Sequence, residues 1–301
     1  MFSRRHPFLF FTLILSSIFA VFLLCLMLMI TSGLFFFQEK LGSKDALQGK
    51  GNVGVIEVSG IISSSMDTVK TIKRMRENNQ IKALVIRVNS PGGGVGPSQE
   101  IYRELIKTKR EKIVIASLGS VAASGGYYIA SAADKIVANP GTITGSIGVI
   151  MEYANIEKIV EKIGLTPVVI KSGEYKDIAS PLREITDKER GILQKVVDEL
   201  HRQFISDAAN GRGMDPKKVS ELADGRIYTG KQALDLKLID QLGNFEDSLS
   251  LAGNLAGIKG EIKPVYPRED RITFIKRLTR SLFKDFNISG PVSDNFRYIA
   301  D

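Results

Sequence analysis

Short apolar runs rich in β-branched residues alternate with amphipathic segments through most of this 301-residue chain. This alternation predicts the α/β fold class, with parallel βαβ units whose sheet is covered by helices. The expected strands are residues 53–58, 83–89, 112–118, 135–138 and 166–171. The expected helices are residues 66–78, 96–109, 122–132, 156–163, 187–210, 216–222, 231–236 and 245–255. About 210 residues in this pattern are enough for one sizeable hydrophobic core.

A long apolar stretch precedes this pattern. Residues 8–37 contain no charged side chain, and about 20 apolar residues suffice to cross a bilayer. We therefore predict a transmembrane helix, with residues 1–37 as N-terminus and anchor and residues 38–52 as a linker. Arg4 and Arg5 precede the stretch, whereas the charges just after it cancel, so the positive-inside rule places the N-terminus in the cytoplasm. A cleavable signal peptide is the alternative, but the apolar core is too long and no clear cleavage site follows it.

One serine lies among unusually small residues, between an apolar strand and a predicted helix. The segment from Ala122 to Tyr128 reads Ala-Ala-Ser-Gly-Gly-Tyr-Tyr, which leaves Ser124 accessible as a nucleophile. A serine alcohol needs a base within hydrogen-bond reach and donors for the oxyanion that its attack creates. Tyr127 and Tyr128 are expected to pack in the core and to take no part in catalysis.

Few side chains could serve as the base, because the chain has only two histidines and one cysteine. His6 precedes the apolar stretch, and His201 lies in a charged helical pattern typical of a solvated surface. Cys25 lies inside the apolar stretch, so its number and place exclude thiol catalysis, a zinc cluster and an intrachain disulfide. A lysine remains, and a lysine base must be neutral, which requires a pKa lowered from about 10.4 to roughly 7–8.

A second glycine-rich turn follows another predicted strand. Three glycines, Gly92, Gly93 and Gly94, come after Asn-Ser-Pro, and both turns lie where an open α/β sheet binds its ligand. Glycine allows close backbone approach, so peptide N–H groups here could face an oxyanion. A tight turn or a phosphate cradle would have the same sequence, although no Gly-Lys-Ser/Thr follows.

Four motifs occur in order: Ser-Pro-Gly-Gly-Gly, Ala-Ser-Gly-Gly-Tyr-Tyr, Thr-Gly-Ser-Ile-Gly-Val from Thr144, and Ser-Gly-x-x-Lys-Asp from Ser172. Together they resemble the signal peptide peptidase A family, in its short single-domain form, over residues 53–255. The resemblance implies a crotonase-like or Clp-protease-like fold, with a peptidase domain over residues 53–258. It also implies a Ser-Lys dyad of Ser124 and Lys176.

Three further residues follow from the same resemblance. Ser146 falls where a hydroxyl orients the lysine, and Gly93 and Gly125 are candidates for the backbone oxyanion hole. Each has an ordinary alternative: Ser146 could satisfy a turn, and Lys176 could form a surface ion pair with Asp177. A nearby carboxylate would raise a lysine pKa, so catalysis requires Asp177 to point away.

The function implied is a membrane-anchored serine endopeptidase that degrades released signal peptides and other apolar peptides. The expected location is the bacterial inner membrane, with the catalytic domain on the extracytoplasmic side. The resemblance also implies a homo-oligomer in which active sites are shared between protomers, and no metal or other cofactor. A crotonase-type acyl-CoA enzyme and a noncatalytic membrane scaffold are the rival functions.

The basic excess of the chain does not indicate a nucleic-acid partner. The net charge is +8, and part of the excess lies near the C-terminus without a recognisable nucleic-acid module. Residues 259–301 are predicted to form a basic extension, with an amphipathic helix over residues 272–288 and a flexible tail after it. That helix could lie on anionic lipid or pack on protein, and the sequence favours neither.

Overall fold

The computed structural model describes residues 8, 12, 15–17, 19–29, 51–267 and 296–299. The chain divides into two units, Met1–Leu47 and Gln48–Asp301. The described residues of the first unit are helical, including the run 19–29. Among the described residues there is no helix with the length and apolar character needed to cross a membrane. The rest of the predicted anchor, and all but the end of the predicted linker, lie outside the described residues.

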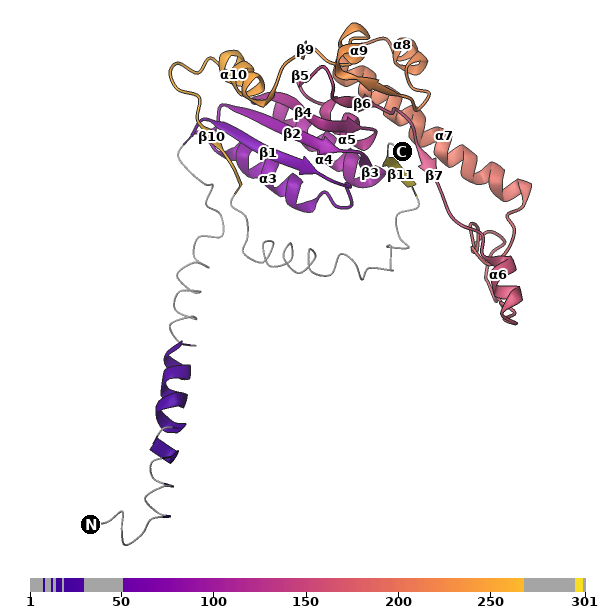
Figure 1. Ribbon diagram of the computed structural model, residues 1–301. Helices are drawn as coiled ribbons and strands as arrows, with labels where there is room; N and C mark the ends of the chain where they lie inside the picture. The colour runs from indigo at the N-terminus through magenta and orange to yellow at the C-terminus, as the bar shows by residue number, and fades with distance from the viewer. Residues whose placement is uncertain are drawn as a thin grey trace. The chain divides into compact units, whose positions relative to one another are not determined.

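The second unit is built on one twisted sheet, shown in Figure 1. In spatial order its strands are β10 (Pro264–Val265), β1 (Val53–Ser59), β2 (Ala83–Ser90), β4 (Ile113–Ala123), β5 (Lys135–Ala138) and β9 (Gln241–Leu242). All these neighbours are parallel. β4 continues beyond its pairing with β5 and pairs in parallel with β6 (Ile143–Gly145), which pairs antiparallel with β8 (Ile227–Thr229). The predicted α/β class is therefore confirmed.

Helices connect these strands and cover the sheet. They are α3 (Met66–Glu77), α4 (Val95–Lys109), α5 (Gly125–Ala130), α6 (Glu157–Lys162), α7 (Asp187–Arg212), α8 (Pro216–Glu221), α9 (Gly230–Asp235) and α10 (Phe245–Leu255). The predicted helix over residues 122–132 begins later, because Val121–Ala123 continue β4 and pair with β6. The strand therefore carries the chain directly into the Ser124 turn.

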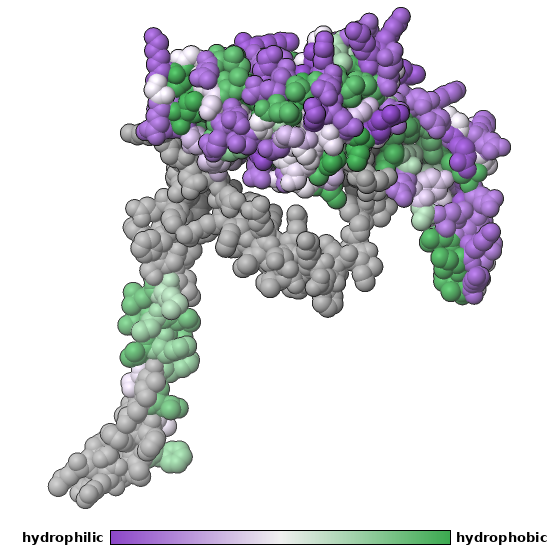
Figure 2. Space-filling model, turned by 45° about the horizontal axis from the view of Figure 1, so that its top comes forward, coloured by the Kyte–Doolittle hydropathy of each residue, from purple (hydrophilic) through white to green (hydrophobic). Residues whose placement is uncertain are grey.

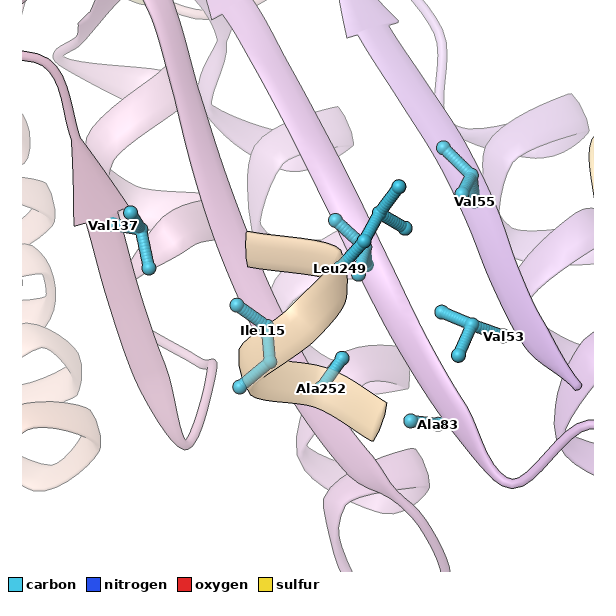
Figure 3. Packing of buried hydrophobic residues seen from close by; sticks show 8 residues of the cluster. Val53, Val55, Ala83, Ile115, Val137, Leu249 and Ala252 are labelled. Carbon is cyan, nitrogen blue, oxygen red and sulfur yellow. The ribbon is translucent and has the colours of Figure 1, made fainter. Parts of the chain in front are cut away.

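Successive side chains along each strand point to opposite faces of the main sheet, and both faces are buried. On one face, Leu249 and Ala252 of α10 pack against valine, isoleucine and alanine side chains of β1, β2, β4 and β5, as Figure 3 shows. On the other face, Gly54 lies against α3, and a Cβ there would be 2.7 Å from the sulfur of Met75. A sheet buried on both faces explains the nearly continuous apolar runs in the sequence.

A second, smaller sheet lies beside the glycine turn. It consists of β3 (Gly92–Gly94), β11 (Phe296–Ile299) and β7 (Ile150–Met151), with β11 in the middle and antiparallel to both neighbours. Residues 296–299, which were expected within a flexible tail, form this strand and pair with segments distant in the sequence. The predicted helix over residues 272–288 lies outside the described residues.

The predicted strand over residues 166–171 is absent. These residues have no regular structure, and Val168 and Ile170 are 82 % and 97 % exposed. They belong to an arm, residues 152–186, which carries α6 and projects beyond α7 in Figure 1. A β-rich run forms a strand only where a neighbour supplies hydrogen bonds, and none of the described strands pairs with this segment.

Candidate active site

Three strands of the main sheet end at the same place. Ser90 of β2 is in register with Ala122 of β4, and Ala123 of β4 is in register with Gly145 of β6. Because these strands are parallel, the turns that follow them emerge at one edge. The sheet thus brings together the glycine turn, Ser124 and Ser146.

Ser124 occupies a sharp turn between β4 and α5. Its φ of 52° and ψ of −117° are rare for a residue with a side chain. The turn is held by backbone hydrogen bonds: the Ser124 amide donates to Gly145 O at 2.8 Å, and Tyr128 N donates to Ser124 O at 2.8 Å. Gly126 allows close packing, since a Cβ there would lie 2.9 Å from Ser90 O. A strained serine on a strand-to-helix turn is the geometry of a nucleophile elbow.

The Ser124 hydroxyl is buried and has no hydrogen-bond partner among the described residues. A buried hydroxyl without a partner loses its hydration and gains nothing in exchange, at a cost of about 1–3 kcal/mol. Such groups are rare in folded proteins and often have a catalytic role. A buried hydroxyl with no hydrogen bond is what we expect of a nucleophile whose base and substrate are both absent.

The glycine turn directs one peptide unit away from the main sheet. Ile62 N donates to Gly92 O at 2.9 Å, and Gly94 N donates to Ile62 O at 2.8 Å. Successive residues of a strand direct their peptide groups to opposite sides, so those of Gly93 face β11. Only glycine fits here, because a Cβ on Gly93 would lie 2.3 Å from Ile62 O. Gly125 is the first residue of α5, where N–H groups have no acceptor within the helix.

Ser146 lies beside the Ser124 turn. It has a φ of 51° and is buried, and its amide donates to Arg226 O at 2.9 Å. The preceding Gly145 has a φ of 79° and accepts the hydrogen bond from the Ser124 amide. The backbone therefore brings together two of the predicted residues, Ser124 and Ser146.

Lys176 is not part of this cluster. It lies on the arm, between α6 and α7, and its side chain is exposed. Within the described part of the chain, its ammonium makes no ion pair and does not hydrogen-bond to Ser124. Asp177 binds Arg183, with Nε to Oδ2 at 2.9 Å, and also Lys171. The alternative in which Lys176 pairs with Asp177 is therefore wrong.

Arg183 forms a brace at the base of the arm, through ion pairs with two carboxylates. No motif in the sequence indicates this role. Its guanidinium binds Asp177 and also Glu189, which forms a capping box with Thr186 at the start of α7. Hydrogen bonds from Arg183, and then from Lys171, hold the pKa of Asp177 well below its usual range. Arg183 and the Thr186 amide lower the pKa of Glu189 to about 2. Both carboxylates are thus ionised at neutral pH, and the brace weakens only as the pH falls below about 4.

Removing this brace should disorder the segment that carries Lys176. For Arg183→Leu we expect a loss of amide protection, seen as faster hydrogen exchange over residues 171–189, because the variant lacks both ion pairs that hold this segment to the start of α7. The thermal transition of the main sheet should barely change. Arg202→Leu is the matched control, because Arg202 forms an exposed pair with Glu199 inside α7; equal losses in both variants would contradict a positioning role.

The remaining sequence candidates have structural roles. Tyr127 and Tyr128 are fully buried, and their hydroxyls donate to Leu238 O and to the Asp207 carboxylate. His201 lies in α7. Among the described residues there is no group of three or more histidine, cysteine or acidic side chains that could hold a metal ion.

The parallel sheet and the buried serine at a strand-to-helix turn define an α/β protein of the Clp-protease-like class. A Clp protease family model matches residues 55–142, and the model of peptidase family S49 matches residues 106–259. The chain belongs to peptidase family S49 and is a serine-type protease. The resemblance to signal peptide peptidase A is confirmed, whereas the crotonase-like comparison is not.

Several curated relatives are similar to this chain. A candidate protease of Synechocystis sp. is 46 % identical over 226 residues, which cover 74 % of this chain and 81 % of the relative. A candidate signal peptide peptidase of Enterococcus faecium is 44 % identical over 59 % of this chain and 52 % of the relative. The chloroplastic serine protease SPPA of Arabidopsis thaliana is 35 % identical over 70 % of this chain and 33 % of its own length. The chain thus spans most of the first relative, about half of the second and a third of the third.

Proposed function

We propose that this protein is a serine endopeptidase in which Ser124 is the nucleophile and Lys176 of a neighbouring copy is the general base. One observation carries the proposal: the Ser124 hydroxyl is buried, strained and without a partner at the edge where three parallel strands end. The hydroxyl needs a base, and in the described part of its own protomer it contacts none.

The proposed reaction has two stages, acylation and deacylation. Ser124 Oγ attacks the peptide carbonyl carbon and transfers its proton to the neutral Lys176 amine. The N–H groups of Gly93 and Gly125 bind the oxyanion, and the Ser146 hydroxyl orients the amine. The C–N bond then breaks and the leaving amine takes the proton from Lys176. Water, deprotonated by the same lysine, attacks the acyl ester; as the ester C–O bond breaks, Lys176 returns that proton to Ser124 Oγ and the acid product leaves.

The arm explains why the lysine would come from another copy. Apolar side chains gather along one side of it, as Figure 2 shows in green. The exposed ones are Ile156, Ile159, Ile163, Leu165, Val168, Val169 and Ile170. An apolar surface of this kind usually marks an interface. Docking on a neighbour would cover it and would also enclose Lys176, which a lysine base requires.

The substrates we propose are apolar peptides at a membrane, including released signal peptides. The charge-free stretch of residues 8–37 would hold the domain at the bilayer, with the N-terminus in the cytoplasm and the catalytic domain outside it. The candidate signal peptide peptidase from Enterococcus faecium supports this substrate class by its name. An apolar peptide can bind in extended form by adding a strand to a free sheet edge.

Mixing two inactive variants tests the shared site. Ser124→Ala and Lys176→Ala should each be inactive alone, but after co-refolding or subunit exchange, mixed oligomers contain sites with an intact serine and an intact lysine. We expect up to about a quarter of the wild-type activity, because random assembly pairs the two intact residues in that fraction of interfaces. A mixture of Ser124→Ala with the double variant is the matched control and should stay inactive. Subunit exchange must first be demonstrated. If the mixture of Ser124→Ala and Lys176→Ala then stays inactive, either both residues act within one protomer or one of them takes no part in the mechanism.

A further inference from the structure

The strand β4 changes its partner just before the chain reaches Ser124. Up to Leu118 it pairs in parallel with β5, and over residues 121–123 it pairs with β6. Between these two regions its register on β2 shifts, so that residues 119–121 of β4 stand where β2 has the single residue Asn89. A bulge of this kind bends a strand and leaves peptide groups without their ladder partners. The bend therefore determines where the Ser124 turn emerges at the edge of the sheet.

Side chains replace the missing ladder partners of the bulge. Asn89 Oδ1 accepts hydrogen bonds from Ser120 N at 3.1 Å and from Val121 N at 3.2 Å. In the segment that leads into β6, the Thr142 hydroxyl donates to Gly119 O at 2.7 Å. The extra residues of β4 are thus held by β2 and by the segment before β6.

The bulge fits closely around Asn89. A Cβ on Gly119 would lie 2.9 Å from Asn89 Oδ1 and 3.0 Å from its Cβ and Cγ, so only glycine fits there. The backbone of Asn89 is held as well, because its carbonyl accepts a hydrogen bond from Gly60 N at 3.0 Å. Asn89 itself lies at the surface rather than in the core. A change of its side chain should therefore alter the bulge and leave the packing of the sheet intact.

Asn89 also joins the two turns of the proposed active site. It immediately precedes Ser90, whose hydroxyl accepts a hydrogen bond from Gly92 N at 3.0 Å in the glycine turn. Val121, whose amide Asn89 binds, lies shortly before Ser124 in the same run of chain. One side chain thus links the turn that carries the proposed nucleophile to the turn that carries a proposed oxyanion donor.

We propose that Asn89 is a positioning residue for the peptidase: its side-chain oxygen holds the bulge in β4 and thereby sets the place of Ser124 relative to the glycine turn. This inference rests on the proposed function, because it assigns Asn89 to the alignment of the same site. Reacting groups must be held in a near-attack geometry, and a misplacement of about 1 Å can cost about 100-fold in rate. Two hydrogen bonds that fix the bulge can therefore matter more for kcat than for folding.

Two substitutions separate the hydrogen bonds of Asn89 from the size of its side chain. Leucine is similar in size but has no acceptor, so for Asn89→Leu we expect kcat for an apolar peptide to fall roughly 10–100-fold with little change in KM. Aspartate keeps an oxygen that can accept from both amides, so Asn89→Asp should stay within about threefold of the wild-type kcat. A purely structural role would lower the yield of folded protein and leave the kcat of the folded fraction unchanged. A wild-type kcat in Asn89→Leu, or an equal loss in Asn89→Asp, would overturn the proposal.

Hydrogen exchange gives a readout that does not depend on hydrolysis. In Asn89→Leu the amides of Ser120 and Val121 should exchange at least about fivefold faster, because both lose their acceptor, whereas Asn89→Asp should protect them as the wild type does. Asn52→Leu is the matched control: the Asn52 side chain also bonds two backbone groups, but before the start of β1, at the other end of that strand from the site. This variant should keep kcat and the exchange of both amides.

The two readouts separate this inference from the proposed function. Faster exchange in Asn89→Leu, without hydrolysis of any peptide by the wild type, would refute the peptidase and keep the hold of Asn89 on the bulge. Hydrolysis by the wild type, with unchanged exchange and kcat in Asn89→Leu, would refute the positioning role and keep the peptidase.

Discussion

Ser124→Ala should lower kcat for an apolar peptide by at least about 10³-fold, as loss of a catalytic nucleophile does in other serine peptidases. The free energy of unfolding should rise by about 1–3 kcal/mol, because the variant no longer buries a hydroxyl that has no hydrogen-bond partner. Alanine and serine both have a Cβ, so the backbone strain at φ 52° stays nearly the same. Steady-state kinetics and urea unfolding of the purified protein measure the two effects.

The matched control is Ser131→Ala, at the end of α5. Ser131 is also fully buried, but its hydroxyl donates to Tyr128 O at 2.7 Å. Losing that bond should cost about 1 kcal/mol of stability and leave peptidase activity intact. The two serines thus predict opposite outcomes, and an active Ser124→Ala variant would remove Ser124 from the mechanism.

The sequence predicted the central sheet well because its strands are buried on both faces. The predicted strand 83–89 differs from β2 by one residue, and the predicted strand 135–138 coincides with β5. The Ser124 turn was also predictable, since only small residues fit where Gly126 meets Ser90. In these places local composition and tertiary environment require the same residues.

The arm and the C-terminal strand were not predictable in the same way. Val168, Val169 and Ile170 have strand-forming side chains, but a strand also needs a neighbour, and periodicity cannot supply one. The pairing of residues 296–299 with β3 joins segments about 200 positions apart, which no local pattern encodes. No sequence motif indicates the ion pairs of Arg183 with Asp177 and Glu189, because they form only when the arm folds back onto α7.

Replacing Lys176 should abolish peptide hydrolysis. As the proposed general base, its amine accepts the proton of the Ser124 hydroxyl in the acylation step. Lys176→Ala should lower kcat by about 10³-fold at every pH, and Lys176→Arg should not restore it, because a guanidinium stays protonated. Lys158→Arg, on the exposed surface of α6, is the matched control and should keep both the rate and the pH profile.

The outcome for arginine separates catalysis from assembly. If Lys176 served only to dock the arm on a neighbour through its charge, arginine would keep the oligomer and most of the activity. If Lys176 is the base, Lys176→Arg forms the same oligomer, measured by sedimentation, and is inactive. Because Lys176 is exposed in a single protomer, arginine can replace it without disturbing the packing of that protomer, and the comparison tests the amine itself.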